Sequence, residues 1–309
     1  MKDFQQITWD ARLEDDCRQL IRLAVREDLD RVYDWTTVAL VGEAAQGHAT
    51  VAARAAGVVA GLPAAKLVLE EYDARIAWTP LAADGQPVTA GQPLATIAGP
   101  ARSLLAAERP LLNLLGHMCG IATLTAQYVA AIAGPRARIY DTRKTLPGWR
   151  RLEKYAVRMG GGTNHRLGLF DAVLIKDNHL ALGAAEQAAT HYTPAEAVRR
   201  AREFLSQFEA GDASAEMLVE VEVDSLAQLA EVLPQRPDIV LLDNMPPDVL
   251  RQAVAMRDQD FSEVQLEASG GISLATIRSV AESGVDRISI GALTHSAAWL
   301  DVGLDWKEK

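Results

Sequence analysis

Residues 141–178 read DTRKTLPGWRRLEKYAVRMGGGTNHRLGLFDAVLIKDN. Two short apolar runs, residues 138–140 and 172–175, have the length of β-strands, and a group of cationic residues follows each run. Parallel α/β sheets and barrels hold their ligands where strands end and loops begin. This stretch therefore predicts a parallel α/β fold whose strand ends carry positive charge.

The positive charge is local. The chain has a formal net charge of -10, yet Arg143, Lys144, Arg166 and Lys176 fall close together in the sequence, with His165 beside them. Arginine grips a carboxylate with two parallel N–H bonds, whereas lysine acts as a point charge. A basic pocket in an acidic protein indicates a small anionic ligand. A nucleic-acid partner is not expected, because a phosphate backbone needs a broad positive surface.

The length and composition bound the class of protein. A chain of 309 residues predicts one large domain and a smaller one. Cys17 and Cys119 lie far apart without CxxC spacing, so neither a disulfide framework nor a zinc site is indicated. The first residues lack the apolar core of a signal peptide, and no apolar run reaches the roughly 18 to 20 residues of a membrane span. We expect a soluble cytoplasmic protein with no membrane partner.

The first hundred residues indicate a small α/β domain. Apolar residues recur at helical spacing over 13–29, and Pro63 opens a second helix that ends near Tyr72. Residues 48–53 and 57–61 are expected to pair as a hairpin, and residues 75–79 read as another strand. The turn pattern of residues 83–97 is similar to that of biotinyl and lipoyl carriers. It lacks their lysine at the hairpin tip, so a structural role is favoured.

Residues 102–133 form a long apolar helical region, which we expect to break near Gly116 and Gly120 and to link two domains. Glu108 and Arg109 within it read as a solvated pair when taken alone.

After Pro135 the chain alternates strand-like and helix-like segments. The strand-like segments are 138–140, 172–175, 218–223, 238–242, 264–268 and 287–290, and the helical ones are 194–208, 225–233, 246–256 and 273–283. Repeated βα units predict a parallel sheet, open or closed, with six strands rather than the eight of a full barrel. Residues 212–216 read as a surface loop.

Two carboxylates stand at predicted strand ends. Glu222 ends the run 219–223 and Asp243 ends the run 239–242, close to the cationic group. Carboxylates in this position suit Mg²⁺, which takes oxygen ligands and keeps several waters, although simple ion pairing explains them equally well. Glu220 shares a strand face with Glu222, and its role is left open.

Two glycine-containing loops indicate a phosphate site. Ser269, Gly270 and Gly271 precede a helix expected to begin near Ser273, and Gly291 follows the next strand. Glycine lets backbone N–H groups approach a ligand, and the last strand loops of barrels often bind phosphate beside a helix N-terminus. His165, after a glycine run, reads by itself as a structural hydrogen-bonding residue.

Several motifs together resemble the decarboxylating quinolinate phosphoribosyltransferase family: the stretch beginning DTRKTLPGW and ending IKDNH, then AERPLLNLLGHMCGIATLT, VEVEVDS, LLDN, SGGIS and IGALTHS. The resemblance is dense over residues 104–305 and weaker before them. It implies an incomplete α/β barrel of the type II phosphoribosyltransferase kind over residues 116–294. It also implies an N-terminal α/β sandwich domain over residues 1–115, which the tail 295–309 joins. The implied reaction converts quinolinate and phosphoribosyl pyrophosphate to nicotinate mononucleotide, pyrophosphate and carbon dioxide in de novo NAD biosynthesis.

The resemblance also implies roles for individual residues. The carboxylates of quinolinate are expected to meet Arg143, His165, Arg166 and Lys176, with Thr142 beside them and Arg109 contributed by the neighbouring subunit of a homodimer. The 5'-phosphate is expected on Ser269, Gly270, Gly271 and Gly291, and the pyrophosphate near Lys144 and Lys176. Mg²⁺ is expected on Glu222 and Asp243, so that the implied catalytic set is Lys144, Lys176, Glu222 and Asp243.

Some residues depart from the family pattern, and three other functions remain open. Gly116 stands before His117 where glutamine is expected, Cys119 stands where serine is expected, and Leu146 replaces a common threonine, which bears on packing and subunit contacts more than on chemistry. Cys119 reads as a small buried residue.

Lys176 lies at a strand end, which is also the position of a Schiff-base lysine in a barrel enzyme acting on a sugar phosphate. A pyrophosphorylase-like relative from molybdenum-transport operons shares the TRKT and HR motifs, and an anion-sensing protein without catalysis is the third alternative.

Overall fold

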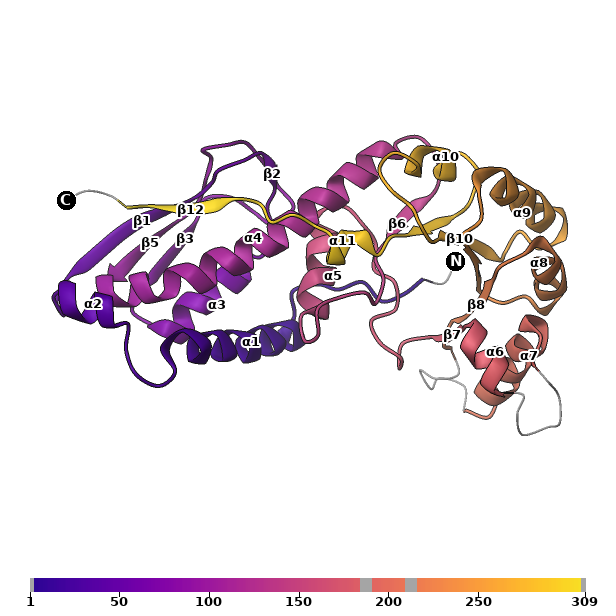
Figure 1. Cartoon of the computed structure of the whole chain (residues 1–309), viewed down its shortest axis with the longest axis horizontal. Coiled ribbons are helices and arrows are strands. Elements are labelled where there is room, and N and C mark those ends of the chain that lie inside the picture. Colours follow the sequence, from indigo (N-terminus) through magenta and orange to yellow (C-terminus); the bar gives the residue numbers. More distant parts are fainter. Residues whose placement is uncertain (1–2, 184–190, 209–215, 307–309) are drawn as a thin grey trace. The chain divides into compact units, whose positions relative to one another are not determined.

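The computed structural model describes residues 3–183, 191–208 and 216–306. These residues form two compact units (Figure 1). The parallel-sheet unit comprises residues 3–6 and 127–143 together with the described part of 163–291, and the antiparallel-sheet unit comprises 7–126, 144–162 and 292–306. Among the described residues, no helix is both long and apolar enough to cross a membrane.

The antiparallel-sheet unit is built on a four-stranded sheet with the order β12-β1-β5-β3. Its strands are β1 (Gln46–Ala53), β3 (Ala77–Pro80), β5 (Pro93–Pro100) and β12 (Val302–Trp306). The C-terminal strand β12 lies antiparallel beside β1, so the end of the chain completes the sheet that the first strand began. Strand β12 lies within the tail 295–309, which the resemblance assigned to the N-terminal domain.

The prediction of a hairpin between residues 48–53 and 57–61 is wrong. β1 pairs with β5 and β12 instead, and the short β2 (Gly57–Val58) pairs with β4 (Pro87–Val88). β1 and β5 are each eight residues long, so their pairing satisfies more backbone hydrogen-bonding groups than a pairing with the shorter second segment.

This unit also contains helices. They are α1 (Ala11–Leu29), α2 (Trp35–Leu40), α3 (Leu62–Tyr72), the first part of α4 (Ala101–Ala131), α5 (Arg150–Met159) and α11 (Ala292–His295). The Asp10 side chain caps α1 by accepting a hydrogen bond from the Leu13 N–H, and the buried face of α1 packs against α3. Apolar spacing predicted α1 and Pro63 predicted the start of α3, and both helices lie at the predicted places.

Helix α4 runs without the break that glycine suggested near Gly116 and Gly120. The two glycines serve close packing instead. A Cβ atom added at Gly120 would lie 2.2 Å from the Ala298 carbonyl oxygen, and one at Gly116 would lie 3.1 Å from that of Leu300. The absence of a side chain therefore lets residues 298–300 lie directly on the helix, which offsets the low helix propensity of glycine.

The parallel-sheet unit contains a six-stranded sheet with the order β6-β11-β10-β9-β8-β7, in which every neighbouring pair is parallel. The strands are β6 (Arg138–Tyr140), β7 (Val173–Ile175), β8 (Val219–Val223), β9 (Ile239–Asp243), β10 (Gln265–Ser269) and β11 (Arg287–Ser289). β6 and β7 form the two edges, so the sheet is open. This arrangement confirms the predicted incomplete α/β barrel.

The helices of this unit follow the strands, as expected for βα repeats. They are α6 (Asp177–Gly183), α7 (Pro194–Leu205), α8 (Leu226–Val232) with the 3₁₀ turn η2 (Leu233–Gln235), α9 (Pro247–Asp260) and α10 (Ile277–Ala281). The prediction that the helix after β10 starts near Ser273 is wrong. Residues 273–276 form a turn in which Thr276 Oγ1 accepts a hydrogen bond from the Ser273 N–H at 3.0 Å, and α10 begins only at Ile277. Of the predicted loop 212–216, all but Glu216 lie outside the described residues.

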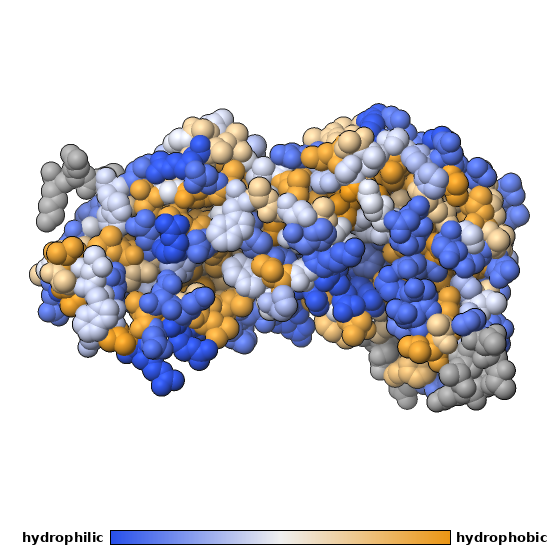
Figure 2. Space-filling view, viewed as in Figure 1, coloured by the Kyte–Doolittle hydropathy of each residue, from blue (hydrophilic) through white to orange (hydrophobic). Residues whose placement is uncertain are grey.

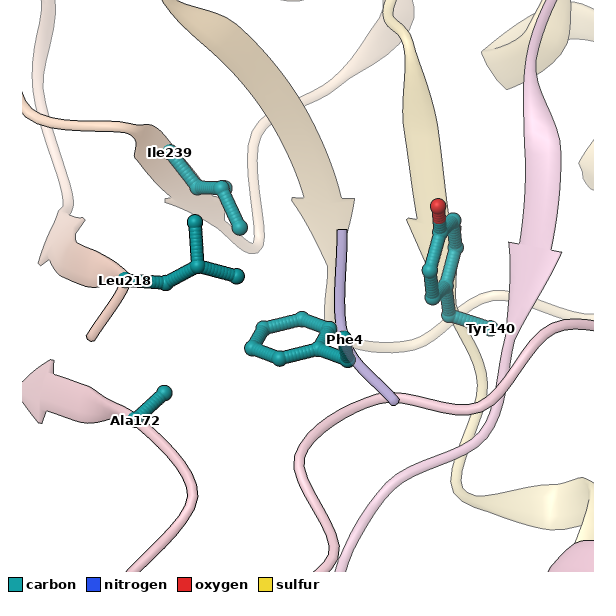
Figure 3. Packing of buried hydrophobic residues seen from close by; sticks show 5 residues of the cluster. All are labelled: Phe4, Tyr140, Ala172, Leu218 and Ile239. Carbon is teal, nitrogen blue, oxygen red and sulfur yellow. The ribbon is translucent and has the colours of Figure 1, made fainter. Parts of the chain in front are cut away.

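One end of the sheet is closed by the N-terminal segment. Phe4 packs with Tyr140, Ala172, Leu218 and Ile239 (Figure 3). Ala172 and Leu218 directly precede β7 and β8, and Ile239 begins β9, so Phe4 covers the amino ends of these strands. The ligand-binding end of a parallel sheet is the opposite, carboxyl end.

Candidate active site

Charged side chains share one face of the parallel sheet. In the parallel register Glu222 lies beside Leu241, Leu241 beside Glu267, and Glu267 beside Arg287. Side chains alternate along a strand, so Glu220 and Asp243 belong to the same face. Glu220, Glu267 and Arg287 are buried, while Glu222 and Asp243, nearer the carboxyl ends, are partly exposed.

Lys176 and Glu222 meet at the carboxyl ends of β7 and β8. Their side chains form an ion pair and are 42% and 17% exposed, so both remain accessible from solvent. The main-chain N–H of Lys176 donates to His179 Nδ1 at 2.9 Å, which fixes the backbone where β7 turns into α6. On the next strand, Asn244 Nδ2 donates to Asp243 Oδ2 at 2.8 Å. Glu222 and Asp243 therefore present carboxylates from two adjacent strand ends on one face.

Two guanidinium groups, those of Arg143 and Arg166, lie close enough for their charges to interact. Arg166 is buried, and its Nη1 donates to the Ala172 carbonyl oxygen at 3.1 Å. Burial lowers the pKa of Arg166, and the positive charge of Arg143 lowers it further. Like charges in a poorly solvated place repel one another, so this arrangement favours the binding of an anion beside them.

Asp141 organises the loop that carries these cations. Its buried carboxylate accepts hydrogen bonds from Asn164 Nδ2 at 2.7 Å and from the His165 N–H at 2.9 Å. It thereby ties the end of β6 to the 163–166 loop. Sequence reasoning gave Asp141 no role, although its place just before the cationic residues was a usable signal. Thr142, between Asp141 and Arg143, is half-buried.

His165 is surrounded by buried carboxylates. Its Nε2 lies 3.1 Å from Glu220 Oε2 and 3.5 Å from Glu267 Oε1, and its Nδ1 accepts a hydrogen bond from the Arg166 N–H at 2.7 Å. The Phe4 ring lies against the imidazole with a centroid distance of 4.4 Å. Potential metal ligands gather here: the donor atoms of His165, Glu220 and Glu267 lie within 4.8 Å of one another. Within the described residues, this is the one such set of three or more side chains. Sequence reasoning did not find Glu267, because nothing in its local pattern marks it.

A cavity of about 260 Å³ lies beside the glycine loop after β10. Its lining includes Ser269, Gly270, Gly271, Met245 and Thr276. Gly270 and Gly271 have φ values of +94° and +61°, and a Cβ atom at Gly270 would lie 2.2 Å from Asn244 Oδ1. Only glycine fits this approach, so the loop requires the residue that the sequence supplies. Gly291 is half-buried just after β11 and the buried Ile290.

Two of the expected site residues belong to the antiparallel-sheet unit. Arg109 is exposed on α4, and Lys144 is exposed with its carbonyl oxygen accepting a hydrogen bond from the Thr294 hydroxyl at 2.6 Å. The parallel-sheet unit holds the remaining ones: Thr142, Arg143, His165, Arg166, Lys176, Glu222, Asp243, Ser269, Gly270, Gly271 and Gly291.

His117 and Cys119, in the segment that contains two departures from the family pattern, have structural partners in the antiparallel-sheet unit. His117 Nε2 lies 2.9 Å from Glu153 Oε1, and both side chains are buried. Cys119 Sγ donates to the Ala60 carbonyl oxygen at 3.3 Å, and burial raises the pKa of the Cys119 thiol to about 12. Cys119 is therefore a small buried residue, as expected, and no reactive thiolate forms at neutral pH.

Comparison with known proteins adds independent findings. Residues 34–119 and 121–305 match the family models for the N-terminal and C-terminal domains of quinolinate phosphoribosyl transferase. The chain is 46% identical over 294 residues to the nicotinate-nucleotide pyrophosphorylase [carboxylating] of Mycobacterium leprae, covering 94% of this chain and 97% of that protein. It is 37% identical to the probable enzyme of the same name from Bacillus subtilis, covering 88% and 87%.

Solved structures of similar proteins have the same fold. The nicotinate-nucleotide pyrophosphorylase of Francisella tularensis superimposes with a TM-score of 0.86 at 35% identity, covering 99% of this chain and 100% of that one. NadC from Streptococcus pyogenes gives a TM-score of 0.83 at 36% identity, covering 97% and 100%. Both likenesses extend over the two units.

Proposed function

The chain belongs to the quinolinate phosphoribosyltransferase family, and from that membership we propose how the residues of the parallel-sheet unit carry out the reaction. The protein is a phosphoribosyltransferase of NAD biosynthesis. It joins quinolinate to the ribose of phosphoribosyl pyrophosphate and forms nicotinate mononucleotide, pyrophosphate and carbon dioxide. The single observation that carries the site assignment is the group of charged side chains at adjacent carboxyl strand ends, where Lys176 pairs with Glu222 and Asp243 ends the next strand.

Quinolinate binds at this cationic group. Arg143 and Arg166 are placed to receive its carboxylates, since a guanidinium matches a carboxylate with two parallel hydrogen bonds. Lys176 adds a third positive charge at the end of β7. At an effective dielectric near 20, one contact at about 4 Å contributes roughly 4 kcal/mol before desolvation, so a dianion gains from all three cations. Thr142 completes this side of the site as a proposed substrate contact.

Phosphoribosyl pyrophosphate binds beside the quinolinate. The cavity lined by Ser269, Gly270 and Gly271 is proposed to take the 5'-phosphate, with Gly291 on the following loop. Positive φ values at the two glycines turn backbone N–H groups into a concave surface of the kind that holds anions. Lys176 is proposed to face the pyrophosphate group and to stabilise the charge that develops on the leaving group. The family resemblance predicts the same role for Lys144.

The carboxylates of Glu222 and Asp243 fit a magnesium ion. They come from adjacent strand ends, share one face, and are both partly exposed. Mg²⁺ takes one or two carboxylates and keeps several waters, so this pair suffices without a third protein ligand. When bound, the ion would supply positive charge to the pyrophosphate of the substrate. The ion pair of Glu222 with Lys176 already sets the position of that carboxylate.

The chemistry needs no protein nucleophile. The bond between ribose C1' and pyrophosphate breaks as the pyridine nitrogen of quinolinate bonds to C1', through an oxocarbenium-like state. Fixed cations stabilise the departing pyrophosphate as its charge grows. The pyridinium nitrogen then accepts the electron pair released when the 2-carboxylate leaves as carbon dioxide. A proton from solvent replaces the carboxylate on the ring, which balances the reaction.

We further propose a homodimer in which Arg109 reaches the site of the neighbouring subunit. Arg109 is exposed on α4, in the unit that lacks the other quinolinate contacts. Exposed apolar side chains on α2, namely Trp35, Val38 and Leu40, support a contact between copies. Figure 2 shows hydrophobic surface at that end of the antiparallel-sheet unit. The cytoplasmic location of the protein stays a prediction.

The Schiff-base alternative is not favoured. A lysine amine must be uncharged to attack a carbonyl group, whereas Lys176 is held in an ion pair with Glu222. Borohydride treatment in the presence of a carbonyl substrate would trap Lys176 if this alternative were correct.

The test of the proposed function is direct. Purified protein is mixed with quinolinate, phosphoribosyl pyrophosphate and Mg²⁺, and nicotinate mononucleotide is followed together with pyrophosphate release. We expect both products in equal amounts, and none when Mg²⁺ is chelated. Pyrophosphate release without nicotinate mononucleotide would contradict the assignment. Binding of phosphoribosyl pyrophosphate with no turnover would support the anion-sensing alternative.

A further inference from the structure

We propose that residues 3–6 position the 163–166 loop for the substrate, and that the side chain of Gln6 is the group that holds the loop. This inference rests on the proposed function, in which Arg166 binds a carboxylate of quinolinate; the family resemblance predicts the same for His165. It gives a part in the reaction to a segment to which sequence reasoning assigned none. Gln6 acts through the loop, so it is a positioning residue rather than a catalytic one.

The 163–166 loop continues the parallel sheet at the edge formed by β6. The Thr163 N–H donates to the Ile139 carbonyl oxygen at 2.8 Å, and the Thr163 carbonyl oxygen accepts the Asp141 N–H at 3.1 Å. Thr163 thereby forms a parallel bridge with Tyr140, the last residue of β6. Because β11 occupies the other side of β6, the loop lies on the free edge of the open sheet. Backbone groups in such a place need partners of their own.

Gln6 supplies these partners to the next residue of the loop, Asn164. Gln6 Oε1 accepts the Asn164 N–H at 2.8 Å, and Gln6 Nε2 donates to the Asn164 carbonyl oxygen at 3.1 Å. Opposite residues of an antiparallel sheet exchange the same pair of bonds, so the Gln6 amide takes the place of a neighbouring strand. Nε2 also donates to the Phe4 carbonyl oxygen at 2.9 Å, which orients the amide. The loop is therefore bonded to β6 through Thr163 and to Gln6 through Asn164.

Asp3 anchors the segment that carries Gln6. Asp3 Oδ2 accepts a hydrogen bond from the Tyr140 hydroxyl at 2.9 Å. Asp3 Oδ1 lies 3.0 Å from Nη2 of the buried Arg287. An ion pair to a buried guanidinium holds its partner more firmly than an exposed pair does. The segment is thus fixed to β6 and β11.

Phe4 anchors the same segment by packing. Its ring is buried in a cluster that includes Tyr140, at the end of β6, and Ala172, just before β7 (Figure 3). These two strands are the edges of the open sheet, so Phe4 fills space between them. The ring also lies against His165, with a centroid distance of 4.4 Å. Residues 3–6 therefore have a defined place from which Gln6 holds the loop.

Fixing the backbone at Asn164 fixes the residues that follow it. His165 and Arg166 come next in the chain, and Asp141 accepts the His165 N–H at 2.9 Å. A misplacement of about 1 Å in groups that bind a substrate can cost on the order of 100-fold in rate. The cavity proposed for the 5'-phosphate is lined by residues between 245 and 280 only. Loss of the Gln6 bonds should therefore affect quinolinate and spare phosphoribosyl pyrophosphate.

The test compares Gln6→Met with Gln5→Met. Methionine keeps the length of the glutamine side chain but has neither its N–H donors nor its amide oxygen. Gln5 is exposed one position away, so the same change there is the matched control. The first measurement is hydrogen exchange of the Asn164 amide in the absence of substrate. We expect at least about tenfold faster exchange in Gln6→Met and no change in Gln5→Met. An unchanged rate in Gln6→Met would overturn the inference.

The second measurement is steady-state kinetics of the same variants. We expect kcat/KM for quinolinate to fall at least about tenfold in Gln6→Met, chiefly through KM, while KM for phosphoribosyl pyrophosphate stays within about twofold. A merely structural role would reduce the folded fraction, which lowers kcat and leaves both KM values unchanged. That result, or an equal rise in both KM values, would overturn the positioning role. The proposed function fails separately, by the absence of product from the wild-type protein.

Discussion

Raising the pH should weaken the parallel-sheet unit through one residue, Glu267. This carboxyl group is fully buried in the middle of the sheet, in the register position next to Arg287. Burial raises the pKa of Glu267 from 4.5 to about 7, and the neighbouring Glu220 adds to the rise. The folded protein therefore binds a proton more tightly at this position than the unfolded chain does.

The sign and size of the effect follow from linkage. Between pH 4.5 and about 7, native Glu267 keeps a proton that the unfolded chain has lost. Its stabilising contribution is complete below pH 4.5 and falls as the pH rises to about 7. At 1.36 kcal/mol for each pH unit, the interval between these two values corresponds to about 3 kcal/mol. Glu267→Gln keeps the shape of the neutral acid without the titration, so it should remove this pH dependence.

The measurement must report on the correct unit. All six tryptophans lie in the antiparallel-sheet unit, so fluorescence would follow the other part of the protein. Amide hydrogen exchange in β8 to β11, corrected for the intrinsic exchange rate, gives the opening free energy of the parallel sheet itself. Glu231→Gln, at an exposed position on α8, is the matched control and should leave the slope unchanged. If Glu267→Gln loses stability with pH as steeply as the wild type, the reasoning is refuted.

Three further predictions concern the site. Lys176→Ala should lower kcat by about 100-fold or more with the far-ultraviolet circular dichroism unchanged, because it removes a charge that stabilises the leaving group; near-normal turnover would exclude Lys176 from the chemistry. Gly270→Ala should raise KM for phosphoribosyl pyrophosphate by at least about tenfold, since the new methyl group would meet Asn244 at 2.2 Å, and an unchanged KM would place the phosphate elsewhere. Saturating pyrophosphate should raise the melting temperature by relieving repulsion among the cations, and this shift should shrink in Arg143→Ala; a wild-type protein with no shift would argue against an anion site.

Local patterns predicted the elements whose cause is local. The spacing of apolar residues predicted α1, Pro63 predicted the start of α3, and the six short apolar runs after Pro135 became the six strands of the parallel sheet. Cationic residues directly after apolar runs indicated a site at strand ends, where Lys176 and Glu222 meet. These features depend on neighbours a few positions away, which a single sequence displays.

Features that depend on distant partners were predicted poorly. Glycine near the middle of α4 suggested a break, but residues 298–300 lie against these glycines and the helix continues. The expected hairpin failed because β5, some forty residues later, offers β1 a longer partner. In both cases a local preference of about 1 kcal/mol or less was overridden by tertiary contacts.

The sequence by itself determined that this protein alternates strands and helices and gathers cations at strand ends, because side-chain periodicity and chain order are local properties. Only the tertiary structure decided which side chains stand together beneath those ends. Glu220, Glu267 and His165 come from segments as many as 102 positions apart; the parallel sheet places the two carboxylates on one face, and the 163–166 loop brings His165 to them. Sheet pairing sets that register through the burial of whole strands, which no short stretch of residues encodes.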